Sequence, residues 1–155
     1  MKNYCWSQNN VVIYNYDFIE LLTDVSIGTN AIIRRVAAKF NLTTSQVYHL
    51  LSIPFDGIPI SGLAHRLGLD NSTLTRNIQK LEKSGLVMRM GDNYDKRIQQ
   101  VVLTESGASL LRSLELRLEE QNGNIMEQID LDTQEHVTTV LEKLSWALGC
   151  IRERT

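Results

Sequence analysis

The stretch DNSTLTRNIQKLEKSGLV, residues 70–87, combines a helix pattern with an exposed polar face. Asp70 is placed to cap this helix, since its carboxylate can accept hydrogen bonds from backbone N–H groups of the first turn. Leu74, Ile78 and Leu81 follow at steps of four and three residues, so they share one buried face. The opposite face is left to solvent, and its members are Asn71, Ser72, Thr75, Arg76, Gln79 and Lys83.

Three helices are predicted before this stretch. The first spans Asp17 to about Phe40, the second is LTTSQVYHLL (42–51) with Thr43 or Thr44 as its cap, and the third is ISGLAHRLG (60–68), ended by a glycine. The segment PFDGIP (54–59) between the second and third is predicted to be a loop. The first helix carries one apolar stripe, formed by Phe18, Leu22, Val25, Ile32 and Val36.

A hairpin and two long helices are predicted after it. LVMRM (86–90) and QQVVL (99–103) are strand candidates, joined by the polar, turn-rich segment GDNYDKRI (91–98). A helix follows Thr104, and Asp132 with Glu135 has the form of a capping box for the last one. The last helix has apolar residues in 4-3-4-3 spacing, which predicts a seam for another helix: Val137, Leu141, Leu144, Leu148 and Ile151.

Helix, tight turn, helix and hairpin is the layout of a winged helix-turn-helix domain, in which the second helix of the pair enters the major groove of DNA. The predicted fold class is mostly α with a small β-hairpin wing. The winged helix-turn-helix domain covers 42–104, and the helices in 1–41 and 105–155 form a dimerisation region of the same continuous domain. A homodimer is expected because the small winged part cannot cover their apolar stripes, Phe18 and Leu22 included.

Composition limits the alternatives. A chain of 155 residues with 43% hydrophobic and 22% charged residues is long enough for one compact domain with a core. It has no apolar run of the roughly 20 residues that cross a bilayer, and its N-terminus lacks the zones of a signal peptide, so we expect a cytoplasmic protein without membrane contact. Two cysteines, Cys5 and Cys150, are too few for a disulfide framework.

Charge is unevenly distributed along the chain. Residues 61–104 carry seven basic and four acidic side chains, a net charge of +3, which leaves −5 for the remainder of a chain whose total is −2. A basic lobe on an acidic body is typical of a protein that binds nucleic acid with one part. The excess is small enough for an ordinary solvated surface, so charge supports the prediction without deciding it.

The sequence LDNSTLTRNIQKLEKSGLVMRMGDNYDKRIQQVVLTESG resembles the recognition helix, wing and following helix start of the MarR family of transcriptional regulators. The family's wing carries an Asp-x-Arg at a fixed interval before a Leu-Thr pair, and Asp95, Arg97 and 103–104 reproduce it. The likeness extends from Leu42 to the C-terminus. It implies that the DNA-binding residues are Asn71, Ser72, Thr73, Thr75, Arg76 and Gln79 on the helix, with Lys96 and Arg97 on the wing and Asp95 as wing support.

Two segments depart from the family pattern. Pro59 and Gly62 replace the polar residues that usually begin the third helix, so we expect it to begin later. The first ten residues match nothing general in the family. Cys5 lies there, and a thiol that senses peroxide is the alternative trigger, because one branch of the family releases DNA when an N-terminal cysteine is oxidised; the spacing in YCWSQ does not match that branch.

The expected function is a homodimeric repressor that binds an inverted-repeat operator in double-stranded DNA and is relieved by a small aromatic or anionic effector, with activation of some promoters left open. No cofactor is predicted: His49, His65 and His136 lie on separate helices without further ligands at metal-binding spacing. No activated nucleophile, paired carboxylates or phosphate loop indicates an enzyme. Trp146 and the N-terminal tyrosines either line an effector pocket or pack the dimer, and packing is favoured. A winged helix that binds protein instead of DNA is the alternative from another class.

Overall fold

A computed structural model describes residues 17–91 and 99–152 of the chain. These residues form six helices and three strands. In chain order they are α1 (Phe18–Lys39), α2 (Thr44–Ser52), β1 (Ile58–Pro59), α3 (Ile60–Leu67), α4 (Asn71–Lys83), β2 (Val87–Gly91), β3 (Gln99–Leu103), α5 (Glu105–Met126) and α6 (Leu131–Arg152).

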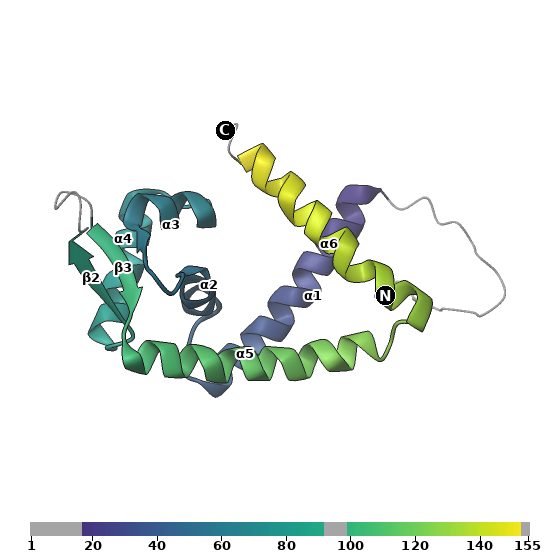
Figure 1. The fold of residues 1–155 in the computed structure, drawn as a ribbon, viewed down its shortest axis with the longest axis horizontal. Coiled ribbons are helices and arrows are strands. Elements are labelled where there is room, and N and C mark those ends of the chain that lie inside the picture. The colour runs from purple at the N-terminus through teal and green to yellow at the C-terminus, as the bar shows by residue number, and fades with distance from the viewer. Residues whose placement is uncertain (1–16, 92–98, 153–155) are drawn as a thin grey trace.

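The elements separate into a winged lobe and a helical arm (Figure 1). Helices α2, α3 and α4 gather with the three strands at one end of the molecule, and α5 runs from this lobe to the other end, where α6 lies. Helix α1 begins beside α6 and runs back toward α2. The strand order is β1-β3-β2 and both pairings are antiparallel. The mostly helical fold with a small wing is therefore confirmed.

The predicted buried face of α4 lies at the centre of the winged lobe. Leu74, Ile78 and Leu81 are fully buried, as are Leu63 of α3 and Val101 of β3. At about 1.5 to 3 kcal/mol for each large apolar side chain removed from water, this cluster is the main source of stability for the lobe. From other helices the buried cluster takes in Leu50 of α2, Leu114 of α5, and Ile33, Val36 and Ala37 of α1.

Local hydrogen bonds explain where the helices begin and end. The Asp70 carboxylate accepts from Thr73 N at 2.9 Å and caps α4 as predicted. Thr43 caps α2 in a capping box with Gln46, which settles the choice between Thr43 and Thr44. Gly68 ends α3 with a φ of 65°, a left-handed conformation in which a Cβ is strained.

Two local predictions were wrong. Ile58 and Pro59, predicted as loop, form strand β1 and pair with Val101 and Gln100 of β3, because β3 offers a free edge that no local pattern reveals. The last helix begins at Leu131 and not at a cap formed by Asp132. The side chain of Asp130 caps it, accepting from Thr133 N at 2.9 Å.

The third helix begins at Ile60, directly after Pro59, at the residue where the sequence pattern placed it. That this start is later than in the MarR family stays a prediction. The two strands of the predicted hairpin are confirmed. They pair in register, with Val87 opposite Leu103 and Gly91 opposite Gln99. Its tip falls outside the described residues.

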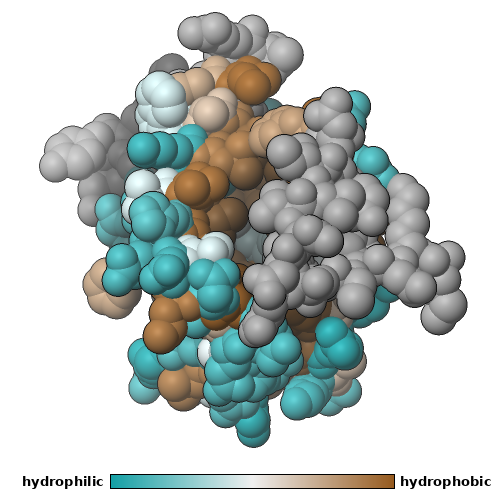
Figure 2. Space-filling view, turned by 90° about the vertical axis from the view of Figure 1, so that its right-hand side faces the viewer, coloured by the Kyte–Doolittle hydropathy of each residue, from teal (hydrophilic) through white to brown (hydrophobic). Residues whose placement is uncertain are grey.

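The helical arm leaves apolar side chains uncovered. In α6, from Leu131 to Ile151, no described side chain is buried, and Leu141, Leu148 and Ile151 are exposed. The first half of α1 behaves in the same way, with Phe18 59% exposed. Figure 2, which views the end of the molecule opposite the winged lobe, shows a band of apolar side chains next to polar ones.

Within the two described ranges, no helix combines the length and apolarity needed to cross a membrane.

Candidate nucleic-acid interface

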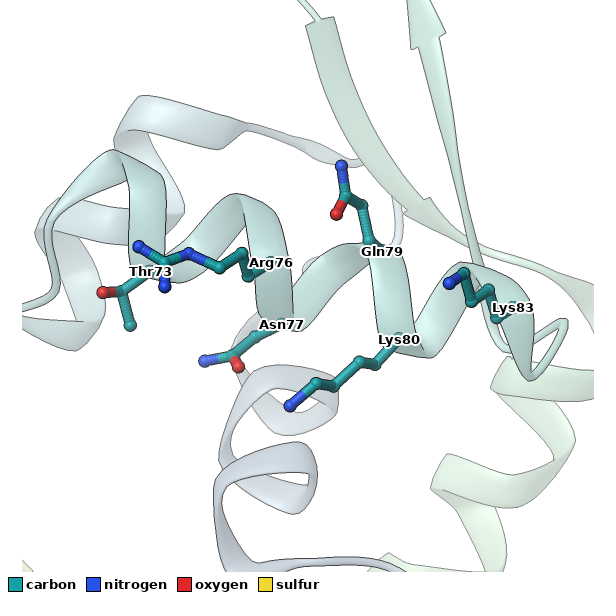
Figure 3. A pocket seen from close by; sticks show the side chains of 6 residues that line it. All are labelled: Thr73, Arg76, Asn77, Gln79, Lys80 and Lys83. Carbon is teal, nitrogen blue, oxygen red and sulfur yellow. The ribbon is translucent and has the colours of Figure 1, made fainter.

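A shallow groove of about 320 Å³ runs along the exposed side of α4. It is lined by Arg76, Lys80 and Lys83 together with three uncharged polar residues, so the lining carries three positive charges and no carboxylate. Figure 3 shows that Asn77 and Lys80 project from one side of the helix and Gln79 from the other. The full lining is Thr73, Arg76, Asn77, Gln79, Lys80 and Lys83.

This groove overlaps the predicted DNA-binding set only in part. Thr73, Arg76 and Gln79 line it, as the sequence led us to expect. Asn77, Lys80 and Lys83 were not in that set. Helical spacing would have found them, because Asn77 and Lys80 stand four and seven residues after Thr73, and Lys83 stands seven after Arg76.

The start of α4 already uses its hydrogen-bonding groups within the helix. Ser72 Oγ donates to Asp70 Oδ1 at 2.5 Å, and these bonds to Ser72 and Thr73 hold the pKa of the Asp70 carboxyl far below its usual range. Asp70 therefore stays ionised at neutral pH and occupies the Thr73 N–H that would otherwise favour a phosphate. A phosphate contact at this end of α4 is disfavoured.

The hydroxyl of Thr75 is used in a similar way. Its Oγ1 donates to the carbonyl oxygen of Asn71 at 2.7 Å, one turn back. Thr75 and Ser72 thus present oxygens that can accept but whose protons are engaged. Asn71 and Ser72 are exposed and Thr75 is half-buried, so the donors for phosphate and base edges on this helix are those of Arg76, the two lysines and the amides.

The wing strand is tied to the C-terminal end of α4. Arg89 of β2 donates from Nε to Glu82 Oε1 at 3.0 Å and from Nη2 to Glu82 Oε2 at 2.5 Å. This two-bond pair lowers the pKa of the Glu82 carboxyl, chiefly through the hydrogen bond from Arg89 and against the effect of burial. Arg89 belongs to the basic count of the lobe, yet its charge is neutralised within the fold.

The wing-tip residues of the prediction, Asp95, Lys96 and Arg97, lie outside the described residues, and so does Cys5. The dimerisation residues Phe18, Leu141, Leu148 and Ile151 are exposed, while Leu22, Val137 and Leu144 are half-buried. Of the three histidines, His65 and His136 are exposed and His49 is buried. The described residues contain no group of three or more side chains arranged to hold a metal ion.

Most of the winged lobe is similar to the MarR family. The model of the MarR family matches residues 54–99, which run from the segment before β1 to the first residue of β3 and include α3, α4 and β2. The HTH-type transcriptional regulator SarZ of Staphylococcus haemolyticus is 39% identical over 77 residues. That match covers 49% of this chain and 52% of SarZ, so the chain spans about half the length of this relative.

A second relative extends the likeness over more of the chain. The HTH-type transcriptional regulator PecS of Dickeya dadantii is 25% identical over 130 residues, covering 81% of this chain and 78% of PecS. The region of similarity therefore takes in helices outside the winged lobe.

Three solved structures share the fold. A crystal structure of MarR has a TM-score of 0.78 at 22% identity and covers 92% of this chain and 97% of its own. CouR from Rhodococcus jostii RHA1, bound to p-coumaroyl-CoA, has a TM-score of 0.74 at 24% identity, covering 91% of this chain and 95% of its own. The S. aureus MepR-DNA complex has a TM-score of 0.69 at 21% identity, covering 86% and 99%.

Proposed function

We propose that the chain is a MarR-family member that acts as a dimeric transcriptional regulator and binds double-stranded DNA in a sequence-specific manner through α4, a proposal supported by the family-model match and the two similar regulators. The groove on α4 is the observation that carries the proposal. Three cations and three amide or hydroxyl side chains on one exposed helix supply phosphate contacts and base-reading groups together.

The proposed interface has two kinds of contact. Arg76 can bond the O6 and N7 atoms of guanine with two parallel N–H groups, and we assign it to base reading. Lys80 and Lys83 carry point charges suited to phosphate oxygens. Lys96 and Arg97 on the wing are proposed to add backbone contacts, with Asp95 orienting Arg97.

The apolar residues of α1 and α6 support the proposal that the active form is a homodimer, and that 1–41 and 105–155 are its dimerisation region around a winged domain of 42–104. A two-fold dimer would present its two α4 helices to half-sites about 10 base pairs apart, centre to centre, and the operator would be an inverted repeat. Phe18, Leu141 and Ile151 are the exposed apolar residues available for this contact.

Regulation by a small molecule is the second part of the proposal. CouR, which shares the fold, is a protein whose structure holds p-coumaroyl-CoA, an aromatic and anionic ligand. We propose repression relieved by an effector of this class, through its differential affinity for two spacings of the recognition helices. Oxidation of Cys5 is the alternative trigger, and treating wild type and Cys5→Ser with peroxide before measuring DNA binding separates the two.

A protein-binding winged helix remains the alternative from another class. It is disfavoured because Lys80 and Lys83 stand on the outer side of α4, whereas lysine is depleted in protein interfaces.

The test is a salt-titrated DNA-binding assay with promoter DNA from the chain's own locus and a scrambled duplex of equal length. We expect tighter binding to the promoter, and an affinity that falls steeply with salt because phosphate contacts release counterions. Equal binding to both duplexes at physiological salt would contradict sequence-specific recognition.

A further inference from the structure

His49 is the one buried polar side chain among the described residues, with 2% of its surface exposed. It lies on α2, behind the recognition helix. Burying an imidazole is costly unless its ring nitrogens find hydrogen-bond partners. Both nitrogens have partners here, and one of them is Asn77 in the lining of the α4 groove.

The partners determine which ring nitrogen carries the proton. Nδ1 of His49 contacts the carbonyl oxygen of Ser45, one turn earlier in α2, and a carbonyl oxygen can only accept. The Ser45 hydroxyl oxygen also lies 3.4 Å from Nδ1, but the carbonyl oxygen is nearer, and we therefore assign the proton to Nδ1. In the neutral ring Nε2 is then an acceptor, and it lies 3.4 Å from Nδ2 of Asn77, which can only donate.

This chain of bonds fixes the orientation of the Asn77 amide. One N–H of Nδ2 is directed to His49, which leaves the other N–H and the acceptor Oδ1 for a ligand. Asn77 is half-buried and stands in the groove beside Arg76 and Lys80 (Figure 3). Adenine is the base that matches, because in the major groove it offers the N6 amine as donor next to N7 as acceptor.

We propose that Asn77 reads an adenine in each half-site and that His49 is the positioning residue that holds the Asn77 amide in the reading orientation. The inference rests on the proposed function, since it concerns how α4 recognises DNA. It assigns a role in base selection to a side chain that does not itself reach the surface of the protein.

The experiment first selects the preferred half-site from random duplexes with wild type, and then measures affinity for all single-base changes with four variants. Asn77→Ala removes the reading group, and His49→Leu removes the acceptor that holds it. His49→Gln keeps an acceptor oxygen near the position of Nε2. Tyr48→Phe is the matched control: it removes another polar contact of α2, the bond from Tyr48 Oη to Asn30 Oδ1 at 3.0 Å, on the side of α1.

We expect Asn77→Ala to lose about 10-fold discrimination at one adenine in each half-site, in line with a two-bond contact between an amide and adenine. His49→Leu should lose discrimination at that same position, and His49→Gln should restore most of it. Tyr48→Phe should leave all positions unchanged. A purely structural role for His49 would instead weaken binding evenly over every position of the site.

A spectroscopic measurement tests the bond without DNA. In ¹⁵N-labelled wild type, we expect His49 to show a protonated Nδ1 and an unprotonated Nε2, and the Asn77 amide resonances to move in His49→Leu. A protonated Nε2 at neutral pH would overturn the inference even if His49→Leu folds too poorly for binding assays.

The two proposals fail in different ways. Wild type that binds all sequences equally overturns the proposed function and this inference together. Wild type that selects a half-site, with Asn77→Ala and His49→Leu selecting it equally well, overturns the inference alone.

Discussion

The winged lobe and α6 place apolar residues of similar helical spacing in opposite environments. Leu74, Ile78 and Leu81 of α4 are fully buried by their own chain, whereas Leu141 and Leu148 of α6 are 51% and 45% exposed. The two patterns look alike in the sequence, since both recur at steps of three and four. Helical periodicity therefore identifies an apolar face but not the molecule that covers it.

The largest effect is expected in the lobe. Leu81→Ala should lower the free energy of unfolding by about 2 to 5 kcal/mol, because it removes buried methyl groups and leaves a cavity. Denaturant titration at several protein concentrations is the measurement. The lost contacts lie within one chain. The denaturation midpoints of wild type and variant should therefore change by the same amount as the protein concentration is varied. A loss under about 0.5 kcal/mol, the range of ordinary surface substitutions, would show that the buried face of α4 contributes no more to stability than an exposed one.

Leu141→Asp is expected to act only through a partner chain. A carboxylate in an apolar seam should raise the dimer dissociation constant about 100-fold, measured by sedimentation over a range of concentrations. Thr139→Asp is the control, since Thr139 is also exposed but lies on the other side of α6. If wild type is a folded monomer at micromolar concentration, α6 is covered by something other than a second copy.

How far the sequence predicts the structure depends on the range of the interaction. Asp70 as the cap of α4 and Gly68 at the end of α3 were predictable because each interaction lies within a few residues. Strand β1 was not, since Ile58 is defined by pairing with a partner 43 residues away, Val101, and its neighbour is a proline. Asp130 competes with Asp132 for the same helix start, and only the path of the chain decides between them.

In the candidate site, too, only the features that depend on neighbouring residues could be predicted. Arg76 and Gln79 could be placed on the groove by helical spacing alone. The role of Asn77 depends on His49, which is 28 residues earlier and reached only through the packing of α2 against α4. Likewise no local pattern joins Glu82 to Arg89, which lie on different elements.

Arg76→Ala should separate binding from stability within the lobe. It removes an exposed side chain, so the unfolding free energy should stay within about 0.5 kcal/mol of wild type. Affinity for the preferred DNA should fall by about 1 to 3 kcal/mol, with relaxed base preference at one position. Lys83→Ala should instead weaken binding to all sequences and reduce the salt dependence.

Arg112→Ala is the control for these two variants, because it removes the same charge from the exposed side of α5. Equal affinities of wild type and Arg76→Ala for the preferred DNA would show that the cationic side of α4 is not the reading surface.

The smallest effect concerns the ion pair that joins the wing to α4. Glu82→Gln should lower the free energy of unfolding at neutral pH by less than about 1 kcal/mol, since the side chains of Glu82 and Arg89 are each 25% exposed and solvent screens them. The pKa of Glu82 is lowered from its usual value of 4.5, so the stabilisation is fully present above that value and is lost as pH falls through the lower, folded-state pKa. The unfolding free energies of wild type and variant should therefore converge in acid, as measured by denaturant titration across this pH range.

Glu120→Gln is the control. It breaks the ion pair of Glu120 with Arg117 on α5, in which both side chains are more than half exposed, and it should have no measurable effect on stability at any pH. A stability difference between wild type and Glu82→Gln that persists well below pH 4.5 would assign the effect to packing of the glutamate and not to its charge.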